Sequence, residues 1–295
     1  MLGDFFCQFS RYTFKDDGAR LTYFRDYNKE VGTGDNTLVG NWVEERALRE
    51  RQGVGARYDA DGAPHAELAL ARRGTAYFAR RLMELRDDEL DAPSLLPGWT
   101  RRHLIAHVGY NARAVARLVE WARTGVETPM YASDTQRGEE IAFGSTLPAR
   151  ALRHLVEHAT VHLNVEWRDL DESGWKARVV TAQGRTVPAR ETAWMRAKEV
   201  WVHAVDLDNG GSFLDFPAEM IDGIIADVFR VWARRSEDVA LIVRPDDRET
   251  EASFGQGGPV VTGSAADLAR WLAGRGARRL TPLGAGELPV IPRWF

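Results

Sequence analysis

The chain has 295 residues, 44% of them hydrophobic, and a formal net charge of -4. This length suits about two domains, and the absence of a basic excess excludes a protein that binds nucleic acid through a positively charged face. No apolar run approaches the ~20 residues that span a bilayer, and the N-terminus lacks a signal-peptide pattern, so we expect a cytoplasmic protein that does not bind membranes. The single cysteine, Cys7, excludes an internal disulfide and a cysteine-cluster metal site.

Residues 1–64 differ from the rest of the chain because they combine turn signals with many aromatic side chains. Helical periodicity is poor there, and we expect partly extended structure with one short helix over 41–52. Two interpretations stay open: a flexible leader, or a segment that docks on a protein partner.

Helical periodicity begins at His65 and continues, with interruptions, to residue 211. Thr100 is a suitable N-cap, and Gly125 and the Asn209-Gly210-Gly211 run are helix stops. Between the third and fourth helices, short β-branched runs on either side of Gly184 indicate a hairpin over 175–189. Long helices with polar connections predict a four-helix bundle over residues 65–211. We expect its helices over 66–85, 100–124, 148–170 and 190–207.

The pattern changes again after Gly211. We expect an amphipathic helix over 217–235, strands over 239–243 and 259–262, and a last helix that opens at Ser264 and ends at Gly274. Residues 212–295 are therefore predicted to form a small α+β domain, and the fold class is mainly α with a smaller α+β part.

Histidines and a glutamate recur at four-residue spacing in the predicted bundle, which places them on shared helix faces. Glu199 and His203 lie four apart among apolar residues of the predicted fourth helix, where a carboxylate without a partner would cost several kcal/mol. A divalent metal ion would satisfy both groups, although Lys198 leaves an ion-pair interpretation open. Three protein ligands with one open position are typical of catalytic zinc. The spacing alone leaves the third ligand open among five histidines: His103, His107, His154, His158 and His162.

Several long blocks resemble the mycothiol-dependent maleylpyruvate isomerases, a family within the DinB-like metalloprotein superfamily. The resemblance covers about residues 66–295 and does not reach residues 1–64. The blocks that carry it are GWTRRHLIAHVGYNARAV (98–115), ETPMYAS (127–133), EEIAFGSTL (139–147), TAQGRTVPARETAWMRAKEVWVHAVDL (181–207) and AGRG (273–276).

The resemblance implies a DinB-like four-helix bundle followed by a smaller α+β domain. It implies a zinc ion, or another divalent metal, on His107, Glu199 and His203, and it implies that Arg275 acts in catalysis by binding a carboxylate of a small dicarboxylate substrate. The implied reaction converts maleylpyruvate to fumarylpyruvate by reversible addition of the thiolate of mycothiol or a similar small thiol, which the metal deprotonates. Asp206 and Asn111, each about one turn from a ligand, are further candidates for the cofactor site.

Two other functions remain as alternatives. One is a transferase that joins a small thiol to an electrophile on the same fold. The other is a docked or structural protein with an inherited enzyme domain, because residues 41–46 weakly resemble filament-binding segments of ciliary microtubule proteins. We expect a monomer.

Overall fold

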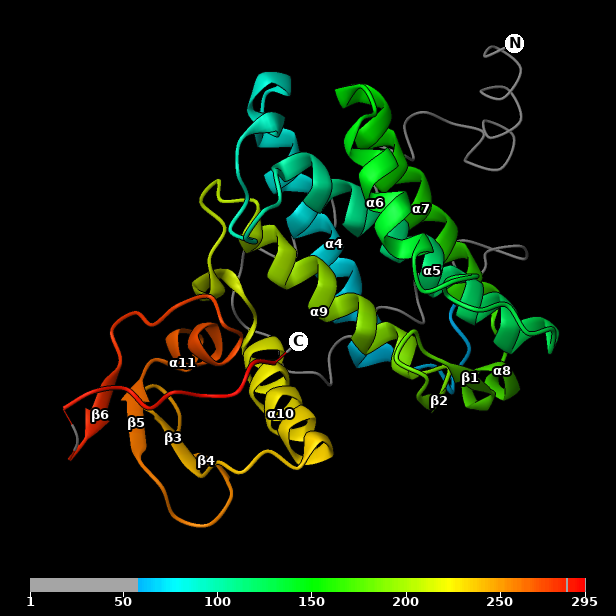
Figure 1. Ribbon diagram of the computed structural model, residues 1–295. Coiled ribbons are helices and arrows are strands. Elements are labelled where there is room, and N and C mark those ends of the chain that lie inside the picture. The colour runs from blue at the N-terminus through cyan, green and yellow to red at the C-terminus, as the bar shows by residue number, and fades with distance from the viewer. Residues whose placement is uncertain (1–57, 285, 295) are drawn as a thin grey trace, which may run out of the picture. The chain divides into compact units, whose positions relative to one another are not determined.

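The computed structural model describes residues 58–284 and 286–294 of the chain (Figure 1). The short helix expected over 41–52, and the proposed docking segment as far as residue 57, lie outside these residues. Four long helices form the bundle that the sequence predicts. They are α4 (His65–Glu84), α5 (Arg101–Thr124), α7 (Ala149–Asp169) and α9 (Glu191–Asp206). Each begins and ends within two residues of its expected bounds.

Local signals explain the ends of α5. The side chains of Thr100 and His103 form a capping box at its first turn. At its other end, Gly125 adopts a left-handed conformation with φ of 72°, which a glycine reaches without steric cost. These two signals place His107 in the second turn of the helix, on its buried side.

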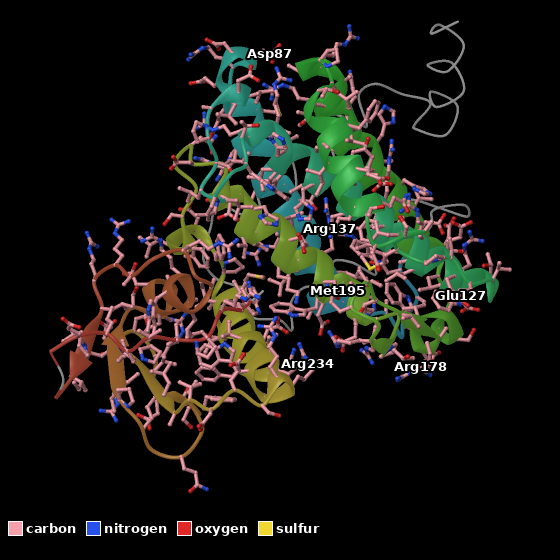
Figure 2. The ribbon with its side chains drawn as sticks, viewed as in Figure 1. Asp87, Glu127, Arg137, Arg178, Met195 and Arg234 are labelled. Carbon is pink, nitrogen blue, oxygen red and sulfur yellow. The ribbon has the colours of Figure 1, made fainter. Side chains whose placement is uncertain are left out.

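The helices pack in pairs: α4 lies along α9, and α5 lies along α7, while α5 also contacts α9. Gly74 permits the close approach of α4 to α9, because a Cβ atom there would lie 2.5 Å from Trp201 Cδ1. Trp201 in turn donates a hydrogen bond from Nε1 to the carbonyl oxygen of Leu70. Charged side chains such as Asp87, Glu127 and Arg178 are exposed and project outward (Figure 2).

The connections of the bundle differ in part from the prediction. The hairpin is present as β1 (Arg178–Val180) and β2 (Thr186–Pro188), with Val179 opposite Val187. The segment expected to be a loop through Pro129 and Gly138 contains a helix, α6 (Gln136–Ser145), which packs on α5. Its buried residues are limited to Ile141 and Gly144, so its sequence carries little helical periodicity. A short helix, α8 (Glu172–Lys176), precedes the hairpin.

The C-terminal part combines two helices with a mixed sheet. Its helices are α10 (Ala218–Arg235) and α11 (Ala265–Leu272), and its strands are β3 (Leu241–Pro245), β4 (Ala252–Phe254), β5 (Val260–Gly263) and β6 (Thr281–Leu283). The strand order is β4-β3-β5-β6, with β3 and β5 parallel and the outer pairs antiparallel. Ser264 accepts a hydrogen bond from the backbone N–H of Asp267, as the predicted cap requires. The two outer strands, each three residues long, were not expected.

Two short 3₁₀ helices complete the described chain, at Asp87–Asp91 and Phe213–Asp215. Among the described residues, no helix is both long enough and apolar enough to cross a membrane. Together, the helices and strands make the fold mainly α, with a four-helix bundle followed by a smaller α+β part.

Candidate metal centre

Three side chains from two helices of the bundle converge in its interior. His107 comes from α5, and Glu199 and His203 come from α9. Each offers one ligand atom, and these atoms all lie within 4.8 Å of one another. Glu199 Oε2 lies 3.1 Å from the Nε2 atom of each histidine. The arrangement forms a two-nitrogen, one-oxygen donor set of the type that binds divalent metals.

The helices explain why these side chains meet. Glu199 and His203 lie one turn apart on α9, so the regular helix alone directs both to one side. His107 belongs to a different helix, and its ring stands nearly perpendicular to that of His203, with 4.9 Å between the centroids. The indole of Trp99 packs edge-on against His107 at 5.5 Å, and this contact covers the ring. His107 is 4% exposed.

The pKa values of the two imidazoles in the cluster are shifted in opposite directions. Burial would raise the pKa of Glu199, but its hydrogen bonds to His107 and His203 prevail and hold that pKa well below its usual range. At His107, by contrast, burial prevails and lowers the pKa of the imidazole. Burial opposes protonation of His203 too, but the hydrogen bonds to Asp206 and Glu199 outweigh it and raise the pKa of that imidazole. The lowered pKa of Glu199 keeps this carboxylate ionised, as binding to a metal requires.

Asp206 continues the cluster away from the ligand atoms. Its side chain is fully buried, and Oδ2 lies 2.9 Å from Nδ1 of His203. A carboxylate on Nδ1 fixes the ring orientation and leaves Nε2 directed at Glu199. Burial would raise the pKa of Asp206, but the contacts with His203 and Arg275 lower it. Asp206 thus remains a negatively charged group that orients His203.

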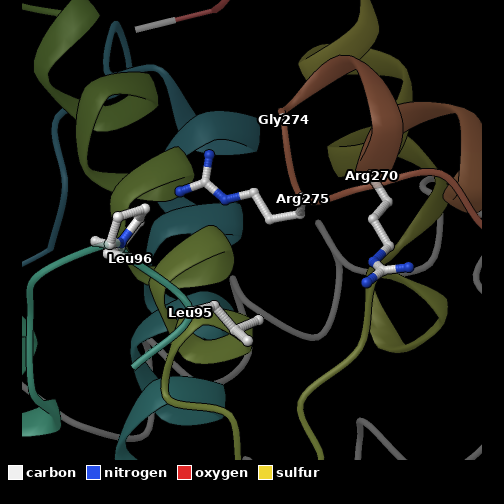
Figure 3. A pocket seen from close by; sticks show the side chains of 6 residues that line it. Leu95, Leu96, Arg270, Gly274 and Arg275 are labelled. Atoms are coloured by element: carbon white, nitrogen blue, oxygen red, sulfur yellow. The ribbon is translucent and has the colours of Figure 1, made fainter. Parts of the chain in front are cut away.

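Arg275 joins the C-terminal part to this cluster. Its Nε donates to Asp206 Oδ1 at 3.1 Å and its Nη2 to Oδ2 at 2.7 Å, while Nη1 donates to the carbonyl oxygen of Ala273. Arg275 also lines a cavity of about 240 Å³ (Figure 3), whose other lining residues are Leu95, Leu96, Pro97, Arg270 and Gly274. The predicted substrate arginine therefore contacts both the cluster and a cavity.

Asn111, the other candidate for the cofactor site, lies one turn beyond His107 and is 6% exposed. Its Oδ1 accepts a hydrogen bond from Arg196 Nη1, with 2.9 Å between the atoms. Its carbonyl side is therefore directed at α9, and its role as a cofactor contact stays a prediction.

The remaining candidate histidines lie outside the cluster. His103 pairs with Thr100 at the start of α5. On α7, His154 and His162 form ion-pair contacts with Glu157 and Glu166, and neither reaches the ligand atoms. Lys198, which left an ion-pair interpretation open, lies 3.0 Å from Asp227 of α10 and not against Glu199.

Sequence reasoning did not single out three residues near the cluster. Arg196 is a buried arginine three residues before Glu199. This spacing, nearly one helical turn, is the signal in the sequence that could have placed Arg196 near the predicted ligand. Tyr131 is half-buried; burial raises its pKa, and the negative charge of Glu199 adds to the increase. Burial lowers the pKa of His107 most, and the positive charge of Arg137 adds a small decrease. Nothing in the sequence alone places Tyr131 or Arg137 near the metal candidates.

The chain is similar to proteins of one kind. The family model for the mycothiol maleylpyruvate isomerase N-terminal domain matches residues 71–208, and the model for the MDMPI C-terminal domain matches residues 215–293. Two crystal structures, of the mycothiol-dependent maleylpyruvate isomerase and of a histidine-to-alanine mutant of it, are each 46% identical in sequence with a TM-score of 0.74. Each alignment covers 78% of this chain and 96% of the solved chain. No curated protein matches the chain.

Proposed function

Since the chain belongs to the family of mycothiol-dependent maleylpyruvate isomerases, we propose that it converts maleylpyruvate to fumarylpyruvate with a divalent metal ion and a small thiol. The observation that carries this proposal is the buried cluster of His107, Glu199 and His203. We propose zinc as the metal and mycothiol, or a similar small thiol, as the cosubstrate.

Two of the three ligand separations suit a zinc ion, and the third pair of ligand atoms lies within 4.8 Å. Zinc lies ~2.0–2.1 Å from nitrogen and oxygen ligands, so two ligands of a tetrahedral site are about 3.4 Å apart. The separations of 3.1 Å between Glu199 Oε2 and the two Nε2 atoms are close to that value. Three protein ligands would leave the fourth position open for a reactant, as in catalytic zinc sites. When bound, the metal would lower the pKa of a thiol at this position and supply the thiolate that adds to the alkene and later leaves.

The chain's own residues would then orient the reactants. Asp206 holds the His203 ring through Nδ1, and Trp99 covers His107. Isomerisation requires the double bond of the substrate to become a single bond for a time, so that rotation is possible. The thiolate would add to the carbon of the double bond that is farther from the ketone, and the electrons of the double bond would then form an enolate with negative charge on the ketone oxygen. Positive charge near that oxygen would stabilise the enolate.

Arg275 is the proposed contact for a substrate carboxylate. A guanidinium has five N–H donors, and three of those of Arg275 are used on Asp206 and Ala273. Among the described residues two therefore remain without an acceptor, one on Nη1 and one on Nη2, and the side chain also lines the cavity of about 240 Å³. A planar pair of N–H groups suits a carboxylate. This position favours a dicarboxylate substrate over an uncharged electrophile.

The test compares His203→Ala with His162→Ala, an exposed histidine of α7 that makes its own carboxylate contact. Metal content is measured by elemental analysis, and turnover is followed by the absorbance of maleylpyruvate with mycothiol present. We expect His203→Ala to lose metal and activity together, because it removes a ligand, and His162→Ala to keep both.

Two results would contradict the proposal. Retention of stoichiometric zinc by His203→Ala would show that the ligand set is wrong. A metal-loaded wild-type protein that leaves maleylpyruvate unchanged, but consumes the thiol with another electrophile, would instead indicate the thiol transferase.

A further inference from the structure

Arg196 is a buried cation that connects the two helices of the metal cluster. Its side chain extends from α9 to α5, where Nη1 donates to the carbonyl oxygen of Val108 at 2.8 Å and to Asn111 Oδ1 at 2.9 Å. Val108 directly follows His107 in the chain, and Arg196 precedes Glu199 by three residues. Both bonds therefore join α5 to α9 at residues that lie within about one helical turn of His107 and Glu199 along the chain.

Stability alone does not explain an arginine at this position. Arg196 is 1% exposed, and among the described residues its Nε and Nη2 atoms have no hydrogen-bond partner. Burial lowers its pKa to about 10, so the group is still charged at neutral pH. Replacement of buried charged groups by apolar residues of similar volume is often neutral or stabilising. A buried arginine with unpaired N–H groups therefore points to a role other than packing.

The helix packing shows what that role requires. Glu199 and His203 share α9, and the helix itself fixes their spacing, whereas His107 is the ligand that α5 contributes. The most extensive contacts of α5 are with α7 and those of α9 are with α4, while the contact between α5 and α9 is smaller. The position of His107 against the other two ligands thus depends on the less extensive contact, which Arg196 spans.

We propose that Arg196 is a positioning residue of the metal centre: through Val108 and Asn111 it holds α5 and α9 in the register that brings His107 to Glu199 and His203. This inference rests on the proposed function, because it presupposes that the three residues bind a metal. It also assigns to Asn111 a contact with Arg196, in place of a contact with a cofactor.

The experiment measures metal binding by Arg196→Met, which keeps an unbranched side chain and removes the charge and both bonds. The affinity for zinc is measured by competition with a chelator, and the visible spectrum of the cobalt(II)-loaded protein reports the geometry of the ligands. We expect zinc affinity to fall about 10- to 100-fold, as is typical when residues that orient metal ligands are changed, and the cobalt spectrum to change. Thermal unfolding of the metal-free protein is measured separately, because the substitution also leaves two buried acceptors, the carbonyl oxygen of Val108 and Asn111 Oδ1, without their donor.

Thr192→Val is the matched control on the same helix. Thr192 is buried, and its Oγ1 accepts a hydrogen bond from Trp167 Nε1, which links α9 to α7 and not to α5. We expect this variant to lower the unfolding temperature of the metal-free protein and to leave zinc affinity and the cobalt spectrum unchanged. Of the two variants, Arg196→Met alone should therefore lower zinc affinity, although each removes a buried hydrogen bond between helices.

Asn111→Ala is a second variant, and it tests the inference even if Arg196→Met fails to fold. It removes one of the two acceptors without changing a charge, so we expect a smaller loss of zinc affinity in the same direction. Wild-type zinc affinity and an unchanged cobalt spectrum in these variants would overturn the inference while the proposed function stands. Failure of the wild-type protein itself to bind zinc or cobalt would overturn both.

Discussion

At the scale of single residues, Asp206 is shared by a predicted metal ligand and by the C-terminal part. It contacts His203 Nδ1 with the same oxygen, Oδ2, that accepts from Arg275 Nη2. The carboxylate is fully buried, so the loss of either partner would leave negative charge with less compensation. The orientation of His203 therefore depends, through Asp206, on a residue 69 positions after Asp206 in the chain, which no helical periodicity could indicate.

Arg275→Ala tests this dependence. From the sequence alone we expect the variant to keep its metal and lose turnover, because Arg275 is assigned to the substrate. The structure adds a second effect: without Arg275, Asp206 orients His203 less well, and zinc affinity should fall by about 10-fold or more. Chelator competition measures the affinity, and the maleylpyruvate assay measures kcat and KM. Full zinc affinity with a raised KM would show that Arg275 acts on the substrate and not through Asp206.

At the scale of elements, the pairing of α4 with α9 positions the helix that carries two of the three proposed ligands. Gly74 lies where the two helices approach, and a Cβ atom there would meet Trp201 Nε1 at 2.6 Å and Val200 Cγ2 at 2.7 Å. The absence of a side chain at residue 74 thus sets how close α9 lies to α4. Sequence periodicity predicts both helices but not this contact.

Gly74→Ala should therefore destabilise the protein, although alanine favours helix formation by about 1 kcal/mol over glycine. The added methyl group overpacks the contact with Trp201, at a cost of about 1–3 kcal/mol. Gly138→Ala in α6 is the control, since a Cβ atom there meets nothing within 4 Å, and it should be neutral or stabilising by up to about 1 kcal/mol. Urea denaturation compares the two; equal free energies of unfolding would contradict the proposed close packing.

At the scale of the whole described molecule, Asp227 links the bundle to the C-terminal part. Its side chain, on α10, is 4% exposed and lies 3.0 Å from Lys198 Nζ of α9. Trp294 near the end of the chain donates to the same oxygen from Nε1. Burial would raise the pKa of Asp227, but the charge of Lys198 and the hydrogen bonds from Lys198 and Trp294 lower it. One carboxylate on α10 thus contacts two parts of the chain that are distant from it in sequence.

Asp227→Ala should destabilise the protein by up to about 3–5 kcal/mol, because Lys198 and the Nε1–H group of Trp294 both lose this buried carboxylate. Arg230→Ala, whose side chain is 54% exposed and contacts the same carboxylate, should cost less than about 1 kcal/mol. Denaturation with urea at neutral and acid pH measures both. Since the pKa of Asp227 is lowered on folding, its contribution is present above the usual carboxyl range and is lost as the pH falls through the lowered value. Asp227→Ala should remove this part of the acid destabilisation; an unchanged acid profile would contradict the role.

The sequence predicts most elements because their signals are local. The four bundle helices, the hairpin and α11 follow from periodicity, caps and turn residues, and each is present in the structure. The same reasoning missed α6, which buries few residues, and the short outer strands β4 and β6, which depend on pairing with β3 and β5. Elements stabilised mainly by neighbours distant in sequence carry too weak a local pattern to be predicted.

The candidate site, like the fold, was predicted from local sequence signals only in part. The sequence by itself determined the pairing of Glu199 with His203, because a helix places residues four apart on one side, and the family resemblance selected His107 among five histidines. The tertiary structure decided how α5 meets α9, and therefore that His107 lies 3.1 Å from Glu199, that Asp206 is shared with Arg275, and that Arg196 spans the two helices. The physical reason is that spacing within a helix is fixed by backbone hydrogen bonds, whereas spacing between helices is fixed by side chains that meet only in the folded chain.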